Sequence, residues 1–162
     1  MRRPRLGADI ARLIFWGLAV SGIKVIIGDW ESCKQDATLI RHEVFVQEQH
    51  VPIEEELDLE DARCIHAVAY DEQGVAVGTG RLLPNAHIGR MAVRASYRGR
   101  GVGSDLLRAL VNEARRHQYL EVVLAAQVHA QPFYAAHGFV AEGGVFLDAG
   151  IEHVTMRHLL TA

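Results

Sequence analysis

The residues best suited to chemistry lie in a glycine-rich segment, "YRGRGVGSDLL", just before an amphipathic stretch. Gly99, Gly101 and Gly103 permit positive φ angles and let a ligand approach the backbone closely. Backbone N–H groups at the start of the following helix, together with the helix dipole, favour a bound phosphate. Arg98 and Arg100 add charge-assisted hydrogen bonds. The segment therefore predicts a pyrophosphate-binding loop, because a bare turn does not require two arginines.

Spacing separates three classes of phosphate-binding loop. A Walker loop, GxxxxGK[ST], needs a lysine that this segment lacks. The dinucleotide fingerprint GxGxxG needs a glycine where Ser104 stands and an acidic residue at the end of the next strand, whereas Glu121 begins that strand. The pattern [QR]xxGxG is met in full by Arg98, Gly101 and Gly103. We therefore expect the third class, with a glycine-rich turn that binds nothing as the alternative.

The composition is that of an ordinary globular chain, with 162 residues, 49% of them hydrophobic, and a formal net charge of −3. This length fits one compact domain. The near-neutral charge argues against a nucleic-acid partner, because nucleic-acid-binding domains usually carry a basic face. Cys33 and Cys64 are the only cysteines and form no CxxC pair, so we expect a reducing compartment, the cytoplasm.

The first residues, 1–21, are expected to form an extension to a single domain at 22–162. Charged "MRRPRL" followed by apolar "LIFWGLAV" has the order of a secretion signal. Asp9 and Arg12 interrupt that order, however, and the apolar run is shorter than the roughly 20 residues of a membrane span. We therefore expect an additional helix or a poorly ordered extension, and no membrane partner.

Hydrophobic periodicity and turn residues indicate strands and helices that alternate along the chain. Strands are expected at 23–30, 64–70, 75–83, 87–93, 120–126, around Phe146 and at 153–159, and helices at 36–49, 104–117 and from Pro132 to Gly138. The acidic run "EEELDLED" between them is expected to be a solvated loop. Antiparallel strands followed by a strand-loop-helix-strand unit indicate an α/β fold with helices on the faces of one sheet.

Two stretches, "RMAVRASYRGRGVGSDLL" and "AQVHAQPFYAAHGF", resemble the pyrophosphate motif and the second motif of the GNAT superfamily of acyl-CoA-dependent N-acyltransferases. The resemblance extends from Ile23 to Leu159. Further stretches, "RHEVFVQEQHVP", "EELDLED", "GTGRL" and "GIEHVTM", are similar to its ElaA-like bacterial branch. The resemblance implies the GNAT fold, a mixed, mostly antiparallel sheet with helices on both faces, and acetyl transfer from acetyl-CoA to a primary amine.

The resemblance also implies roles for particular residues. The general acid would be Tyr134, and Phe133 would pack on the cofactor or the core. Gln127 stands where the superfamily often has asparagine, as a contact to pantetheine. Val93 would polarise the thioester carbonyl through its N–H. The remaining cofactor contacts would be backbone groups, at Met91, Ala92 and Val93 toward pantetheine and at Arg98, Gly99, Arg100, Gly101, Val102, Gly103 and Ser104 toward the pyrophosphate.

The chemistry of acyl transfer sets what else the site needs. An amine attacks the thioester and a thiolate leaves, so the site needs a donor for the oxyanion and a proton for sulfur. A tyrosine with a pKa of about 10 is protonated at neutral pH and can supply that proton. The general base stays open among Glu43, Glu48, His66, His129 and His153. Glu43, Glu48 and His66 are also expected to contact the acceptor.

Other kinds of site find little support. "HEVFV" begins like a zinc-protease helix, but HExxH needs a histidine where Val46 stands, and we expect no metal. No GxSxG elbow is present. The alternatives to an acetyltransferase are a non-catalytic acyl-CoA-binding module and, more remotely, a nucleotide-binding oxidoreductase. The closing stretch "GVFLDAGIEHVTM" can serve either as a homodimer interface or as a covered edge.

Overall fold

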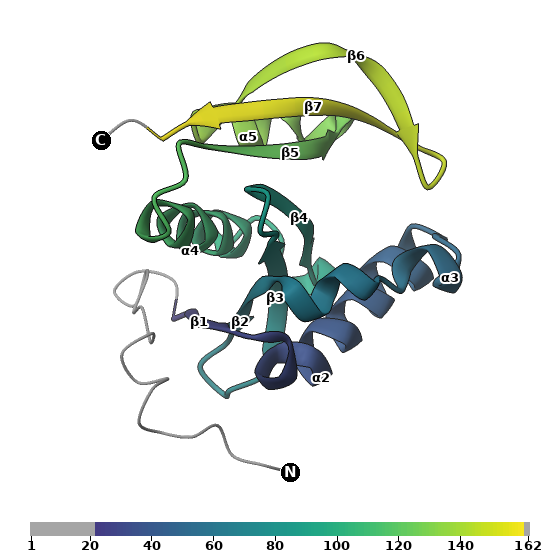
Figure 1. Ribbon diagram of the computed structural model, residues 1–162. Helices are drawn as coiled ribbons and strands as arrows, with labels where there is room; N and C mark the ends of the chain where they lie inside the picture. Colours follow the sequence, from purple (N-terminus) through teal and green to yellow (C-terminus); the bar gives the residue numbers. More distant parts are fainter. Residues whose placement is uncertain (1–21, 161–162) are drawn as a thin grey trace.

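A single seven-stranded sheet runs through the computed structural model, which describes residues 22–160 (Figure 1). Its strand order is β1-β2-β3-β4-β5-β7-β6. Every neighbouring pair is antiparallel except β4 and β5, which are parallel. The strands are β1 (Lys24–Gly28), β2 (Ile65–Tyr70), β3 (Ala76–Leu82), β4 (His87–Val93), β5 (Glu121–Gln127), β6 (Val140–Asp148) and β7 (Ile151–Leu159). The mixed, mostly antiparallel sheet expected from the sequence is confirmed, and the expected extension 1–21 lies outside the described residues.

Two long helices cover opposite faces of the β1–β4 part of the sheet. Ala67 and Ala69 of β2 belong to the buried cluster that includes the leucines of α4 (Val102–Arg116), whereas Val68 belongs to the cluster built on α2 (Trp30–Arg41). Successive residues of a strand point to opposite faces, so the two helices lie on either side. Shorter helices complete the fold: η2 (His42–Glu48), α3 (Ile53–Glu56), η3 (Leu59–Arg63), η4 (Ala95–Tyr97), η5 (Val128–Ala130) and α5 (Gln131–Ala136).

Local signals explain where the helices begin and end. Helix α4 starts after Gly101, which adopts a left-handed φ of 84°, and it buries an apolar stripe. Helix α2 starts at Trp30, earlier than the expected residue 36, because the Asp29 side chain caps it by accepting a hydrogen bond of 2.9 Å from the N–H of Ser32. The strand expected at 23–30 therefore ends at Gly28.

A change in helix type follows α2. The chain continues without a break into η2, a π-helix, in which the N–H of Gln49 bonds the carbonyl of Val44 at 3.1 Å. The helix expected at 36–49 is thus present in two segments. Single turns of this wider helix occur often at functional sites. Here the turn carries Phe45 and Gln49 to the edge of a cavity described below.

The acidic run "EEELDLED" is not the solvated loop expected from the sequence. It forms α3 and η3, and Glu56 and Asp61 are buried. Asp61 accepts hydrogen bonds from Arg41 at 2.9 Å and Arg81 at 2.8 Å. Burial by itself would raise the pKa of the Asp61 carboxyl, but the hydrogen bonds and charges of the two arginines outweigh it and lower that pKa. The segment is therefore an ionic layer that joins α2 to the sheet.

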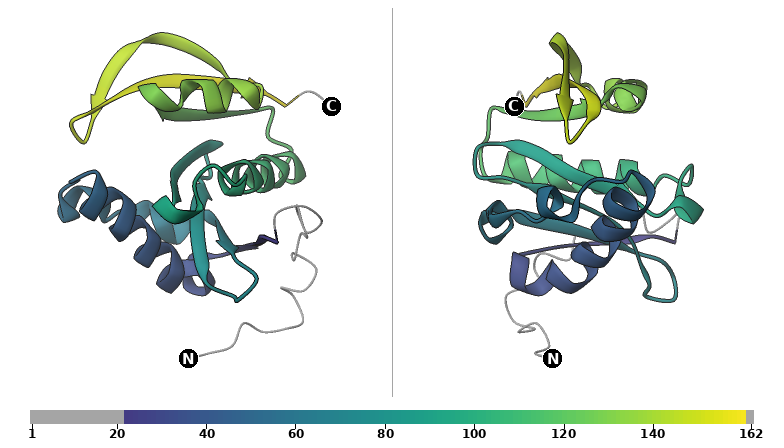
Figure 2. Two further views of the ribbon diagram at one scale, coloured as in Figure 1. Left: turned by 180° about the vertical axis from the view of Figure 1, so that it is seen from behind. Right: turned by 90° about the vertical axis from the view of Figure 1, so that its right-hand side faces the viewer.

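The parallel strands β4 and β5 are paired over only two residues and then diverge. Only His87 with Val123 and Ile88 with Leu124 are paired. The register between β3 and β4 then shifts where Arg90, with a φ of 50°, enters a bulge. Figure 2 shows how the two parts of the sheet diverge, with β5, β7, β6 and α5 at one end of the molecule and β1 to β4 at the other.

Two further expectations concern the outer parts of the fold. The hairpin of β2 and β3 is confirmed, and its turn is closed by Asp71, whose side chain accepts from the N–H groups of Gln73 and Val75. Strand β6 is an edge strand exposed along its length, and the homodimer stays a prediction. Within residues 22–160, no helix is long and apolar enough to cross a membrane.

Candidate active site

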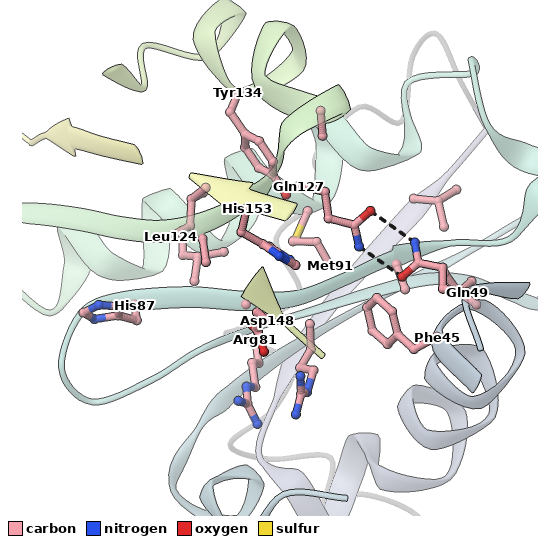
Figure 3. Close-up of a pocket in the computed structure, with 18 of the residues that line it drawn as sticks. Phe45, Gln49, Arg81, His87, Met91, Leu124, Gln127, Tyr134, Asp148 and His153 are labelled. Carbon is pink, nitrogen blue, oxygen red and sulfur yellow. Dashed lines mark hydrogen bonds between the residues drawn. The ribbon is translucent and has the colours of Figure 1, made fainter. Parts of the chain in front are cut away.

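A cavity of about 500 Å³ opens where β4 and β5 diverge. Residues of β4 line one side and residues of β5 the other, as Met91 and Leu124 show in Figure 3. Arg98 and Tyr134 also line the cavity. Beyond Ile88, β4 has only β3 as a strand partner, so one edge of its backbone faces this space. An extended ligand can pair with such an edge as an added strand would.

The glycine-rich loop lies beside this cavity at the start of α4. Gly99 and Gly101 have left-handed φ angles of 74° and 84°, and a Cβ at either would meet nothing within 4 Å. The first backbone hydrogen bond of the helix runs from Asp105 to the carbonyl of Gly101 at 3.0 Å. The N–H groups of Val102 and Gly103 precede that bond and have no partner within the helix. The loop therefore offers open space and unused donors, as a phosphate site requires.

The arginines of the loop hold other groups of the chain. Arg98 donates from Nε to the carbonyl of Val93 at 2.9 Å and from Nη2 to Glu48 at 2.8 Å. Arg100 lies over the ring of Tyr97, 5.2 Å from its centroid. Arg98 thus ties the loop to β4 and to η2.

Tyr134 places a hydroxyl in the same cavity. It comes from α5, is 9% exposed, and packs edge-on against Phe133 and Phe139 at centroid distances of 5.0 and 5.9 Å. Burial raises its pKa to about 12. The hydroxyl therefore stays protonated at physiological pH and can give a proton to a leaving group.

The chain matches the family model of the acetyltransferase (GNAT) domain over residues 30–160. This chain belongs to the GNAT family. A relative from Bacillus subtilis, an uncharacterized N-acetyltransferase named YjcF, is 39% identical over 137 residues, which are 83% of this chain and 98% of that protein. The match confirms the predicted resemblance and identifies the protein as an acetyltransferase of the GNAT type.

Solved GNAT structures agree with this assignment. Escherichia coli ElaA superposes with a TM-score of 0.75 at 26% identity, covering 83% of this chain and 99% of its own. An acyl-CoA N-acyltransferase from Pseudomonas aeruginosa superposes with a TM-score of 0.73 at 30% identity, covering 84% of this chain and 99% of its own. The fold and the ElaA likeness expected from the sequence are both supported.

Five of the twelve expected cofactor contacts and the expected acid meet at one cavity. Met91, Ala92, Val93, Arg98, Gln127 and Tyr134 all line the cavity. Phe133 packs edge-on against Tyr134, and a Cβ on Gly103 would come within 3.3 Å of the Phe133 ring. The hydroxyl of Ser104 is bonded to His137 at 2.9 Å. Their roles toward the cofactor stay predictions.

The expected acceptor contacts are placed elsewhere. Glu43 pairs with Arg94, with oxygen to nitrogen distances of 2.7 and 3.2 Å, and Glu48 pairs with Arg98. His66 is 1% exposed, packs on Trp30, and lies 2.9 Å through Nε2 from the carbonyl of Asp61. None of these three side chains lines the cavity. His66 is buried on β2 beneath α2 and η3, and the contacts of all three residues with an acceptor stay predictions.

One contact at the cavity was missed by sequence reasoning. The carboxamides of Gln127 and Gln49 exchange two hydrogen bonds, of 3.0 and 3.3 Å, across the space between β5 and η2 (Figure 3). The two residues lie 78 positions apart, so no local pattern links them. Arg90 and Asp148 also line the cavity and were not anticipated. Among residues 22–160, no cluster of side chains suited to a metal ion is present.

Proposed function

We propose that this GNAT protein is an N-acetyltransferase that moves an acetyl group from acetyl-CoA directly to a primary amine. The observation that carries the proposal is a cavity lined by the free edge of β4, by a protonated Tyr134 and by Arg98, the residue that leads into the open glycine loop. Pyrophosphate, pantetheine and thioester follow one another along coenzyme A, and we assign them in turn to the loop, the strand edge and the Tyr134 hydroxyl.

The residues of the cavity supply the chemistry of direct transfer. The N–H groups at the start of α4 bind the pyrophosphate, and the edge of β4 orients the pantetheine arm. The N–H of Val93 stabilises the oxyanion that develops as the amine attacks. Tyr134 then gives its proton to the departing sulfur. No covalent enzyme intermediate is needed, because the amine attacks the thioester carbon itself.

A second cavity of about 500 Å³ offers a place for the acceptor. It shares Phe45, Gln49, Arg90, Gln127, Asp148 and His153 with the first cavity. Glu55 and Asp148 provide carboxylates, while Val51 and Ile151 provide apolar contact. This lining supports an acceptor that carries an ammonium group on an apolar stem.

We place the reaction in the cytoplasm, a proposal supported by two cysteines that are both thiols.

Exchange of the proposed acid tests this function. Thiol release from acetyl-CoA is measured with phenethylamine, spermidine and a lysine-containing peptide as acceptors. We expect turnover with at least one amine and, for Tyr134→Phe, a loss in kcat of about 100-fold at unchanged acetyl-CoA affinity. Tyr119→Phe is the matched control, because Tyr119 lines neither cavity and its hydroxyl donates to the backbone carbonyl of Pro84. Acetyl-CoA binding without turnover, and without any effect of Tyr134→Phe, would instead identify a binding module.

A further inference from the structure

His153 lies where the two cavities meet. It comes from β7, lines both cavities, and is 8% exposed. Its ring stacks on Phe146 with a centroid distance of 6.0 Å and an interplanar angle of 25°. Figure 3 shows the imidazole among Tyr134, Gln127 and Met91. A group at this position can reach both an acceptor and the point of acyl transfer.

One hydrogen bond fixes which nitrogen of His153 carries the proton. Nδ1 lies 2.7 Å from the carbonyl oxygen of Ile151. A carbonyl only accepts, so Nδ1 must donate, and in the neutral ring the lone pair then belongs to Nε2. Within residues 22–160, no group forms a hydrogen bond with Nε2. The backbone thus orients an unprotonated nitrogen beside the cavity.

The other basic groups considered for this site are engaged or lie elsewhere. Glu43 and Glu48 are held in ion pairs with arginines, and His66 is buried beneath α2. His129, on η5, lines the first cavity alone and is exposed. His153 is therefore the one of these five groups that borders both the donor side and the acceptor side.

We propose that Nε2 of His153 is the general base that takes a proton from the acceptor ammonium, an inference that rests on the proposed acetyltransferase function. The ammonium loses two protons overall. Nε2 takes the first, which frees the lone pair of the nitrogen, and passes it to water. The C–N bond then forms as the C–S bond breaks, and the sulfur takes the electron pair and the Tyr134 proton. The second proton leaves the nitrogen and restores Tyr134 through water.

Labelling with bromoacetyl-CoA tests the position of this nitrogen without a known acceptor. The probe carries an electrophilic carbon at the site of the acetyl group, so Nε2 forms a C–N bond to it and bromide leaves. We expect peptide mass spectrometry to find the label on His153, with protection by excess acetyl-CoA and no labelling in His153→Gln. Labelling confined to another residue, or none at all in protein that binds acetyl-CoA in calorimetry, would overturn the proposal.

Kinetics test the role of His153 as a base. With the same amines as acceptors, we expect His153→Gln to lower kcat by about 100-fold at unchanged acetyl-CoA affinity. Added imidazole should restore turnover to His153→Ala, because the truncation leaves a space beside an open cavity. His158→Gln and His158→Ala, on the same strand but outside both cavities, are the controls.

The outcomes separate this inference from the function on which it rests. Full turnover in His153→Gln, or a defect in His153→Ala that imidazole leaves unchanged, contradicts the base while the acetyltransferase stands. The absence of acetyl-CoA binding and of turnover in every variant, the wild type included, contradicts the proposed function itself.

Discussion

Tyr134 combines access to the cavity with an environment that keeps its proton in place. Burial raises its pKa to about 12, with Phe133 and Phe139 packed around the ring. Because the charged form is the one that burial disfavours, the hydroxyl loses its proton only at a pH well above that of a free tyrosine. The proposed acid therefore remains competent across the whole range in which an amine becomes a better nucleophile.

The raised pKa of Tyr134 leads to a prediction about the rate at alkaline pH. The ratio of wild-type kcat to Tyr134→Phe kcat should stay constant from about pH 7 to about pH 10, where a free tyrosine would be half ionised. Initial rates at saturating acetyl-CoA, taken across that range for both proteins, provide the ratio. A ratio that falls toward one below pH 10 would show that Tyr134 titrates like a free tyrosine and contradict its role as a buried acid.

The individual residues differ in how far sequence reasoning could place them. Gly99, Gly101 and Tyr134 were predicted because their motifs are short and local. The ion pair of Glu48 with Arg98 joins residues 50 positions apart, and the bond between Gln127 and Gln49 joins residues 78 apart. Such partners depend on how separate elements pack, which no local pattern records. His153 was a candidate base, but only the Ile151 carbonyl and the cavity distinguish it from the others.

At the scale of elements, the ionic layer between α2 and β3 lies next to the second cavity, which Glu56 of that layer lines. Arg41 of α2 and Arg81 of β3 both donate to Asp61 of η3. The sequence showed six carboxylates in a run and suggested solvent, because a charge run is usually a solvated surface. The arginines that pair with this run lie on other elements, Arg41 on α2 and Arg81 on β3. The run itself therefore could not show that two of its carboxylates are buried.

Removing the central carboxylate should weaken the fold in a pH-dependent way. Asp61→Asn is expected to lower the free energy of unfolding at pH 7 by about 3 kcal/mol, since it leaves two buried guanidinium groups short of a partner. The pKa of Asp61 is lowered in the folded protein, so its contribution is fully present above its unfolded pKa of about 3.9, begins to fall below that value, and is lost as the pH falls through the lower pKa of the folded state. Urea unfolding from pH 7 down to about pH 3 should therefore show the two proteins converging in acid.

Glu60→Gln is the matched control for that experiment. Glu60 belongs to the same acidic run, but its ion pair with Arg63 is largely exposed, with side-chain accessibilities of 42% and 65%. Exposed pairs contribute little, so the stability of this variant should stay within about 1 kcal/mol of the wild type. Equal losses in Glu60→Gln and Asp61→Asn, or a difference that persists in acid, would contradict the buried role of Asp61.

At the scale of the whole molecule, the site exists because β4 and β5 part after two residue pairs. The strands and helices were predicted from periodicity and turn residues, which act locally. The divergence accompanies the bulge at Arg90, the pairing of β7 with β5 and the packing of α5 against β5, and none of these features has a sequence signal that we recognised. Motif spacing could therefore predict a phosphate loop and a tyrosine, but not the cavity in which they meet.

The central claim is that this cavity binds acetyl-CoA through the glycine loop, and calorimetric titration tests it most directly. We expect saturable acetyl-CoA binding by the wild type, no comparable heat with NAD or ATP, and loss of binding in Gly101→Glu, whose side chain would enter the open space beside α4. Gly143→Glu adds the same charge at a left-handed glycine on the edge strand β6 and should bind normally, with thermal melting confirming that both variants fold. Acetyl-CoA binding that survives in Gly101→Glu, or wild-type protein that binds NAD as well as acetyl-CoA, would contradict the account.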